Sequence, residues 1–436
     1  MSRIKKIFKN IIPKAVLNAY HLDLAYLANF YYGKPSEKLI IIGVTGTNGK
    51  STTVNLIGKI LEEAGHKVVI SSTVNFKVGD KDDLNDLKMT MPGRFFLQKL
   101  LARGVKAGCK FAVIESSSEG ILQSRHVGIH YDVMVFTNLT PEHIEAHGGF
   151  ENYKNAKLEY FRHLENLPHK FIKGIKIPKS IMVNIDDQYA SEFLNFKVDK
   201  KITYGLTENA QVRGSNLNAT EQGIQFWVGQ TGFSLHLKGI FDVYNTLAAI
   251  AVAQDCEIDI SVAKQALEKI SNIPGRMELI DEGQNFKVLV DYSPEPESLK
   301  QMYATVKNWP HNKIIHLLGS TGGGRDVARR KILGNIAGEN ADIVIVTNED
   351  PYDDDPKEII HQVADGAVEV GKIIKQNLFR DPDRRNAIAK ALSLAQPNDL
   401  VILTGKGSEQ KMAVKGGYIP WDDRAVAREE LQKLKK

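Results

Sequence analysis

The chain has 436 residues, enough for two or three domains, and its 42% hydrophobic and 25% charged residues are typical of a globular protein. The net charge of +5 is mild and does not indicate nucleic-acid binding, and no apolar run reaches the length of about 18 residues that a membrane-spanning helix needs. The two cysteines, Cys109 and Cys256, lie far apart without metal-type spacing. This excludes a disulfide framework and predicts a cytoplasmic protein.

The first 22 residues carry basic side chains and no acidic ones, with apolar residues at helical spacing. A signal peptide would need a continuous apolar segment and a small-residue cleavage site, and both are missing. Two interpretations stay open: a helix that packs on the body, or a basic helix in weak contact with an anionic membrane surface. Residues 31–38 predict a turn-rich link, so residues 1–38 form a short N-terminal extension.

The stretch GVTGTNGKST, residues 43–52, follows an apolar run and precedes a series of helix formers. A strand, a glycine-rich turn and a helix start form an anion site, because backbone N–H groups and the helix dipole point at a phosphate. Here Lys50 is expected to reach the β- and γ-phosphates of ATP, and Ser51 to bind Mg²⁺. Val44 stands where the strict pattern has glycine, so the stretch predicts a variant phosphate-binding loop.

Two further apolar runs end in polar residues, FAVIESSSEG at 111–120 and YDVMVFTNLTPEHIEAHGG at 131–149. Ligands lie at the carboxyl ends of parallel strands, so Glu115 and His143 are candidate Mg²⁺ ligands beside Ser51. His143 also fits a surface-loop histidine. A helix is predicted over 151–161, where the pattern alone favours a surface position for Lys157, with its stem along the apolar face.

The last third of the chain alternates apolar runs with helical patterns. The runs KIIHLLGS, ADIVIVTNEDP and NDLVILTGKG each end in polar or glycine residues. Helical patterns separate them at 298–309, 326–339, 356–369 and 383–395. This alternation predicts an open parallel sheet with a ligand-binding edge.

These motifs together resemble the Mur ligase family, and within it the MurE group of muramoyl-tripeptide synthetases. The similar stretches run through residues 39–436 in the family's order: GVTGTNGKST, ESSSEGILQSR, TNLTPEHIEAHGGFENYKNAK, GIFDVYNTLAAIAVA, IPGRMELI, VDYSPEPESL and LTGKGSE. The resemblance implies an α/β fold in which a central P-loop ATPase domain with a mostly parallel sheet precedes a C-terminal Rossmann-like domain. It implies domains at 39–274 and 275–436, with a hinge at Pro274–Gly275, and ATP-dependent amide formation through an acyl phosphate.

The resemblance also implies roles for individual residues. The expected ATP contacts are Gly46, Thr47, Asn48, Gly49, Lys50, Ser51, Thr52, Asn245, Asp291 and, at the γ-phosphate, Arg276. The expected Mg²⁺ ligands are Ser51, Glu115, His143 and a carbamylated Lys157. The expected contacts to the muramoyl-peptide and the amino acid are Thr90, Ser118, Gln123, Arg125, Glu349, Asp350, Gly405 and Glu409. Catalysis is expected to depend on Lys50, Lys157, His143 and Arg276, which surround the transferring phosphoryl group.

The chain departs from the family pattern where substrates bind. The usual UDP-binding domain is reduced to residues 1–38, and Tyr352 replaces the arginine that binds diaminopimelate in relatives. The acids Glu349, Asp350 and those at 353–355 surround that position, which predicts lysine or ornithine as the added amino acid. We expect a monomer that adds a free amino acid to a peptidoglycan precursor. The alternatives are the same chemistry on a folate-polyglutamate, cyanophycin-type or lipid-linked substrate, or a non-catalytic nucleotide-binding module.

Overall fold

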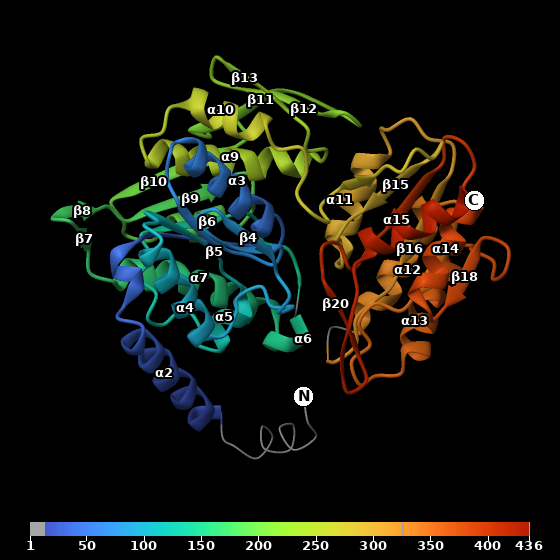
Figure 1. The fold of residues 1–436 in the computed structure, drawn as a ribbon, viewed down its shortest axis with the longest axis horizontal. Helices are drawn as coiled ribbons and strands as arrows, with labels where there is room; N and C mark the ends of the chain where they lie inside the picture. Colours follow the sequence, from blue (N-terminus) through green and yellow to red (C-terminus); the bar gives the residue numbers. More distant parts are fainter. Residues whose placement is uncertain (1–13, 143, 325–326, 436) are drawn as a thin grey trace.

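The computed structural model describes residues 14–142, 144–324 and 327–435. They form two α/β lobes side by side, each built on its own sheet, as Figure 1 shows. The α/β class and the mostly parallel sheets expected from the sequence are confirmed. Among the described helices, none combines the length and hydrophobicity that crossing a bilayer demands.

The N-terminal extension is helical where it is described. Helix α2 (Lys14–Tyr31) is followed by the 3₁₀ helix η1 (Pro35–Lys38), which occupies the predicted link. Helix α2 lies against α4 (Arg94–Lys106) and buries Ala25 and Ala28, while it projects from the lobe at the lower left of Figure 1. The first part of the predicted basic helix, residues 1–13, lies outside the described residues.

The first lobe contains a large sheet with the strand order β13-β12-β11-β10-β9-β6-β1-β5-β2-β3-β4. Its parallel centre comprises β1 (Ile40–Thr45), β2 (Val68–Ser71), β5 (Phe111–Glu115), β6 (Val133–Phe136), β9 (Ser180–Asn184) and β10 (Lys200–Gly205). Its edges comprise β3 (Asn75–Val78), β4 (Lys81–Leu84), β11 (Val212–Thr220), β12 (Gly223–Val228) and β13 (Thr231–Leu235). A separate hairpin pairs β7 (Lys170–Ile172) with β8 (Ile175–Ile177).

Helices cover both faces of this sheet, which explains the continuous apolar runs in its central strands. One face carries α3 (Lys50–Glu63), α9 (Ile240–Asp255) and α10 (Ile260–Glu268). The other carries α4 and α7 (Phe150–Asn166), with the short helices α5 (Ser118–Leu122), α6 (Ile144–His147) and α8 (Ala190–Leu194) nearby. Along β1, Ile42 packs into the first core and Ile41 into the second. Successive side chains of β1 point to opposite faces of the sheet and thus pack into two separate cores.

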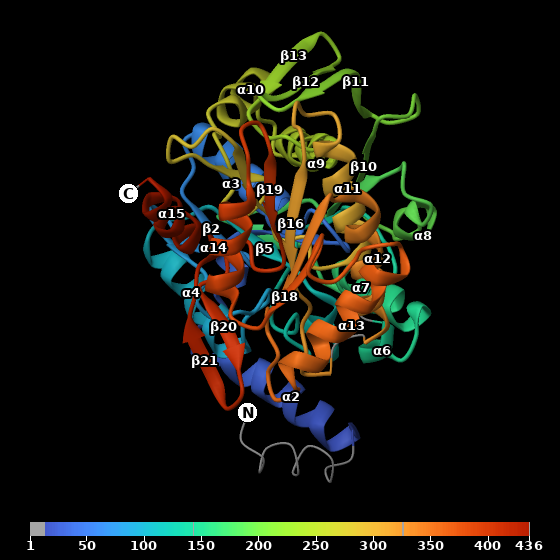
Figure 2. The same cartoon turned by 90° about the vertical axis from the view of Figure 1, so that its right-hand side faces the viewer.

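The second lobe is an open sheet in the order β14-β15-β19-β16-β17-β18, parallel except for β14, and Figure 2 shows its helices flanking it. The strands are β14 (Glu278–Ile280), β15 (Lys287–Val290), β16 (Ile314–Leu318), β17 (Ile343–Thr347), β18 (Leu378–Asp381) and β19 (Leu400–Leu403), with a hairpin of β20 (Lys411–Val414) and β21 (Gly417–Pro420). The helices are α11 (Pro296–Val306), α12 (Ala328–Asn340), α13 (Pro356–Glu369), α14 (Arg384–Leu394) and α15 (Asp423–Leu434). Helices α11 to α14 confirm the four predicted helical patterns.

The expected hinge, Pro274–Gly275, lies between α10 and β14, where the chain passes from the first sheet to the second. Residues two or three positions beyond the carboxyl ends of β1, β5, β16, β17 and β19 line one cavity between the lobes: Thr47, Ser117, Thr321, Glu349 and Gly405. The fold therefore brings the ligand-binding edges of two parallel sheets face to face.

Candidate active site

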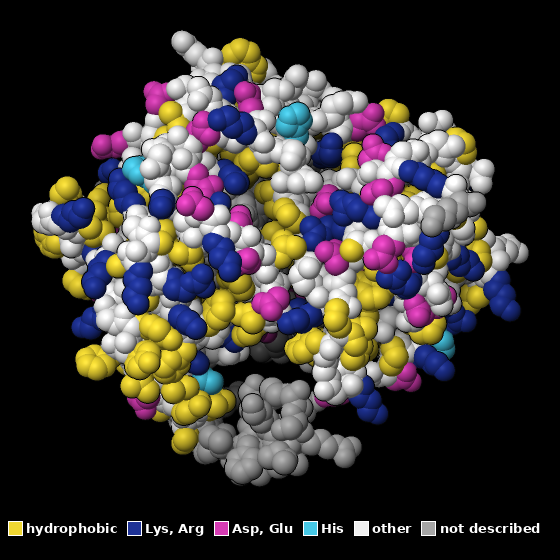
Figure 3. Space-filling view, viewed as in Figure 1, with side chains coloured by type: hydrophobic (Ala, Val, Ile, Leu, Met, Phe, Trp, Pro, Cys, Tyr) yellow, Lys and Arg dark blue, Asp and Glu magenta, His cyan; other side chains and the backbone are white. Residues whose placement is uncertain are grey.

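A cavity of about 510 Å³ lies between the lobes. In Figure 3 the surface is hollowed along the line where they meet. Its wall includes these residues predicted from the sequence: Thr47, Asn48, Gly49, Lys50, Ser51, Thr52, Thr90, Glu115, Ser118, Arg125, Lys157, Asn245, Arg276, Asp291, Glu349, Asp350, Gly405 and Glu409. Gly46 and Gln123 do not line the cavity, and the Gln123 side chain accepts a hydrogen bond from Arg125 at 2.7 Å. His143 lies outside the described residues.

The loop from β1 to α3 has the backbone of an anion site. Gly46 and Gly49 have φ angles of 147° and 82°, in the region that favours glycine. A β-carbon at Gly46 would lie 1.9 Å from the Thr137 hydroxyl, and one at Gly49 would lie 2.1 Å from the Asn245 amide oxygen. No side chain caps the N-terminus of α3, so its first N–H groups are available to a phosphate.

The hydroxyl of Ser51 joins the two lobes at this loop. It donates to the buried Glu115 carboxylate at 2.8 Å, and Arg276 Nη2 of the second lobe lies 3.4 Å from its oxygen. The guanidinium of Arg276 stacks on the Tyr292 ring at 4.4 Å. Its Nη1 is buried and has no hydrogen-bond partner within the described part of the chain. A half-buried cation with a buried, unused donor beside this loop suits an anionic ligand.

Lys157 lies beneath the same loop. Its side chain is 1% exposed, so the surface position that the pattern alone favours is wrong. Its Nζ donates to the Gly46 carbonyl at 2.6 Å and lies 4.4 Å from the centre of the Tyr153 ring. Burial, and after it the Lys50 ammonium, hold the pKa of Lys157 well below its usual range. Burial at this site therefore disfavours the charged ammonium form.

The donors near Ser51 fit a Mg²⁺ ion held largely by phosphate oxygens and water. Mg²⁺ prefers hard oxygen ligands and usually takes only one or two carboxylates from the protein. Glu115 supplies one carboxylate, and Glu142 also lines the cavity, where it accepts a hydrogen bond from Tyr153 at 3.1 Å. Within the described ranges, no three His, Cys, Asp or Glu side chains converge on one metal position.

Asn245 and Asp291 take part in contacts that hold the wall of the cavity. Asn245 donates to Asp242 at 3.0 Å, and its oxygen accepts from Thr53 at 3.3 Å. Asp291 accepts the Met277 N–H at 2.8 Å, and burial raises its pKa. Both side chains therefore position the phosphate loop and the start of the second lobe, besides facing the cavity.

The residues expected to contact the muramoyl-peptide and the amino acid line the same cavity. Thr90 accepts from the Thr73 hydroxyl at 3.0 Å, and Ser118 lies 3.1 Å from His147 Nε2. Burial and the neighbouring Asp350 raise the pKa of Glu349 to about 7. The residues at 353–355 do not line the cavity, and Asp355 instead caps α13 through the Lys357 N–H at 2.9 Å.

Two further cations of this cavity, Lys88 and Arg329, are not among the expected site residues. Lys88 lies two residues before Thr90 and reaches across to the second lobe, where it pairs with Asp350. Arg329 of α12 is buried at the wall and pairs with Glu295. Lys88 belongs to none of the quoted stretches, whereas Arg329 lies in the glycine-rich, basic stretch STGGGRDVARR at 320–330, which resembles a loop of the family.

An enzyme that brings an arginine from a second lobe to a phosphate-binding loop is of the class that uses a nucleoside triphosphate. Comparison with protein-family models identifies residues 44–253 as "Mur ligase middle domain" and residues 275–407 as "Mur ligase, glutamate ligase domain". The chain therefore belongs to the Mur ligase family, whose members are ATP-dependent amide-bond ligases.

Individual relatives agree with this family. The chain is 38% identical to the UDP-N-acetylmuramyl-tripeptide synthetase of Roseiflexus sp. (strain RS-1), over 97% of this chain and 84% of the relative. It is 35% identical to the UDP-N-acetylmuramoyl-L-alanyl-D-glutamate--2,6-diaminopimelate ligase of Geobacillus kaustophilus (strain HTA426), over 96% of this chain and 84% of the relative. The similarity to the MurE group expected from the motifs is thus confirmed.

Solved structures show the same fold. A structure of a UDP-N-acetylmuramoyl-L-alanyl-D-glutamate--2,6-diaminopimelate ligase superposes with a TM-score of 0.60 at 28% identity, over 91% of this chain and 79% of that one. The folylpolyglutamate synthase of Mycobacterium tuberculosis superposes with a TM-score of 0.69 at 13% identity, over 95% of each chain. At that identity the second likeness concerns the fold alone.

Proposed function

We propose that the protein is a cytoplasmic ligase that joins the amino group of a free amino acid to a carboxylate of a muramoyl-peptide precursor, at the expense of ATP and through an acyl phosphate. The observation that carries the proposal is the approach of Arg276, from the second lobe, to Ser51 of the phosphate loop at 3.4 Å. The names of the relatives at 38% and 35% identity support the muramoyl-peptide as substrate. We further propose the domain limits 39–274 and 275–436, and a monomer.

In this proposal the cations around the cavity permit two anions to meet. The attacking carboxylate and the γ-phosphate are both negative, so Lys50 and Arg276 neutralise their encounter and stabilise the transferring phosphoryl group. ATP supplies the phosphoryl group, and Mg²⁺ would spread its charge, held through Ser51 and Glu115. The amine, positioned from the second lobe, displaces phosphate from the acyl group, and phosphate leaves as the amide bond forms.

We also propose that Lys157 carries a carbamate. A carbamate forms when a neutral amine attacks CO₂, with loss of one proton, and the low pKa of Lys157 supports the neutral amine. The modification turns a buried amine that contacts the Gly46 carbonyl into an anion beside the phosphate loop. An anion at that place would serve as a further Mg²⁺ ligand, together with Ser51 and Glu115.

The first test is a substrate panel. We expect phosphate release from ATP only when a UDP-muramoyl dipeptide and an amino acid are both present, and we expect L-lysine or L-ornithine to exceed meso-diaminopimelate and L-alanine. Phosphate release that needs an amino acid but not the dipeptide would indicate that the protein acts on another carboxylate substrate. Nucleotide binding without release under any combination would contradict a ligase function.

The exposed face of α2 supports weak contact with an anionic membrane. Phe30 is 77% exposed and Tyr31 is 72% exposed, and with Val16, Tyr20, Tyr26 and Leu27 they form the apolar patch at the lower left of Figure 3. Aromatic side chains prefer the membrane interface. The residues that precede α2 are basic without an acid, which complements anionic headgroups.

Vesicle sedimentation tests this contact. We expect the protein to sediment with vesicles containing phosphatidylglycerol, and we expect Phe30→Ser combined with Tyr26→Ser to weaken binding about tenfold, because two exposed apolar side chains are lost. Phe171→Ser is the matched control, since Phe171 is 63% exposed on the β7–β8 hairpin of the same lobe. Equal loss in the control, or equal binding to neutral vesicles, would contradict the proposal.

A further inference from the structure

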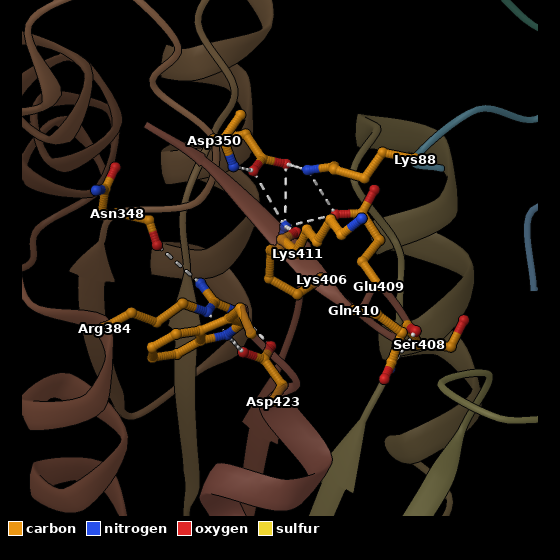
Figure 4. A network of polar contacts seen from close by, with 12 residues as sticks. Lys88, Asn348, Asp350, Arg384, Lys406, Ser408, Glu409, Gln410, Lys411 and Asp423 are labelled. Atoms are coloured by element: carbon orange, nitrogen blue, oxygen red, sulfur yellow. Dashed lines mark hydrogen bonds and ion pairs between the residues drawn. The ribbon is translucent and has the colours of Figure 1, made fainter. Parts of the chain in front are cut away.

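Lys88 extends from the first lobe into a cluster of charges in the second, as Figure 4 shows. It lies in the loop between β4 and α4, and its ammonium pairs with Asp350 and lies 2.9 Å from a Glu409 oxygen. The side chain is only 5% exposed. Lys406 pairs with the same two carboxylates, at 3.1 Å from both oxygens of Asp350. Two ammonium groups therefore share two carboxylates between the lobes.

The cluster is held firmly from the second lobe without help from Lys88. Asp350 also accepts the Ala413 N–H at 2.6 Å, and Lys406 donates to the Lys411 carbonyl at 2.8 Å. The backbone of Lys88 is strained, because its φ angle of 53° lies in the left-handed region that residues other than glycine rarely adopt. Burial works against its charge, but Glu409 and Asp350 raise the pKa of Lys88 above its usual value.

The ammonium of Lys88 ends in the cavity where the proposed function places the incoming amino acid. Lys88, Asp350 and Glu409 all line that cavity. The lysine side chain shows by its own contacts that the space between the two carboxylates binds a primary ammonium. Lys88 and Thr90 lie in the same loop of the first lobe, and both line the cavity. The Lys88 ammonium therefore comes from the loop that is expected to contact the muramoyl-peptide.

We propose that the Lys88 ammonium occupies the position that the side-chain ammonium of an incoming basic amino acid takes between Asp350 and Glu409. The preference for lysine or ornithine expected from the acidic pocket is therefore weaker than the two carboxylates alone would give. With Lys88 in place, the charges of Asp350 and Glu409 are balanced by Lys88 and Lys406. Without Lys88, the pair retains one uncompensated negative charge and an open ammonium position. This inference rests on the proposed function, since it assigns these carboxylates to the amino-acid side chain.

Lys88→Met tests the inference, because methionine keeps much of the side-chain length and removes the charge. L-lysine and L-norleucine are the probes, since they differ chiefly in the terminal ammonium. We expect the KM for L-lysine to fall relative to that for L-norleucine by about tenfold or more, the scale of a charge-assisted contact. Lys411→Met is the matched control: it removes an exposed ammonium that lies 3.5 Å from Asp86, also across the lobes, and should leave the ratio unchanged.

A purely structural role for Lys88 gives a different result. Loss of an interlobe contact would change both KM values together, or lower kcat for both amino acids, and either result would overturn the inference. Equilibrium dialysis of radiolabelled L-lysine, in the presence of a non-hydrolysable ATP analogue, gives a second measurement that needs no turnover. If the wild-type protein ligates no amino acid, the proposed function fails, while tighter L-lysine binding by Lys88→Met would still support the ammonium position and unchanged binding would refute it.

Discussion

Replacement of Lys50 by alanine should reduce ligation by about 10³-fold or more, the scale seen when a cation that stabilises a transferring phosphoryl group is lost. Lys50 begins α3, and its ammonium donates to the Thr47 carbonyl of the same loop at 2.6 Å. It belongs to neither apolar core of its lobe, so the substitution should leave the fold intact. Amino-acid-dependent phosphate release measures the loss, and circular dichroism measures the fold.

Lys59→Ala is the matched control for this prediction. Lys59 lies on the same helix, 3.4 Å from Glu62, with its side chain 47% exposed, and an exposed pair of this kind contributes little to stability. Its replacement should leave turnover near the wild-type value. A folded Lys50→Ala protein with near-normal turnover would contradict the proposed role of this loop in binding the ATP phosphates.

Replacement of Lys157 by alanine should lower turnover by about 10²-fold or more, because a charged group next to the transferring phosphoryl is lost. Alanine also leaves a small buried space beside the Gly46 carbonyl. A short-chain carboxylic acid in excess should enter that space and restore part of the activity, since its carboxylate resembles the proposed carbamate. Turnover at a series of acetate and propionate concentrations checks this.

Two variants separate chemistry from packing at this position. Lys157→Met keeps the side-chain volume but leaves no room for an added acid, so it should be inactive and should not be rescued. Lys154→Met, one turn earlier on α7, removes ion pairs with Glu151 and Glu192 at 3.0 and 2.9 Å and should stay active. A structure with ATP and Mg²⁺ that shows a bare Lys157 ammonium would rule out the carbamate.

The phosphate loop could be predicted from the sequence because its parts are neighbours in the chain. The run from Gly43 to Thr52 contains the strand end, the turn glycines and the helix start, so its chemistry is local. The helices of the second lobe were predictable for the same reason, since their apolar periodicity is local. The burial of Lys157 was not, because it depends on the Gly46 carbonyl, 111 residues away in the chain.

The charge of the proposed amino-acid pocket could not be predicted from the sequence alone. The sequence reveals a run of acids from Glu349 to Asp355, but not which of them face the cavity. One of the two cations that pair with Asp350 is Lys88, 262 residues earlier in the chain, and no local pattern connects the two. The predicted preference for lysine or ornithine therefore depends on a contact that only the folded chain defines.

The two lobes have separate hydrophobic cores, and this has a consequence for how such enzymes diversify. The loop from β1 to α3, proposed to bind phosphate, packs on one pair of cores, whereas Glu349 and Glu409 follow strands of the other pair. Substitutions near Glu349 and Glu409 that change the choice of amino acid should therefore leave the packing of the ATP-binding lobe largely unchanged. Amino-acid selection and ATP use can then evolve independently. Two side chains cross between the lobes: Arg276 of the second lobe reaches Ser51 of the first, and Lys88 of the first lobe pairs with carboxylates of the second. A recombinant that exchanged only the second lobe would retain a Lys88 that is matched to its former partner.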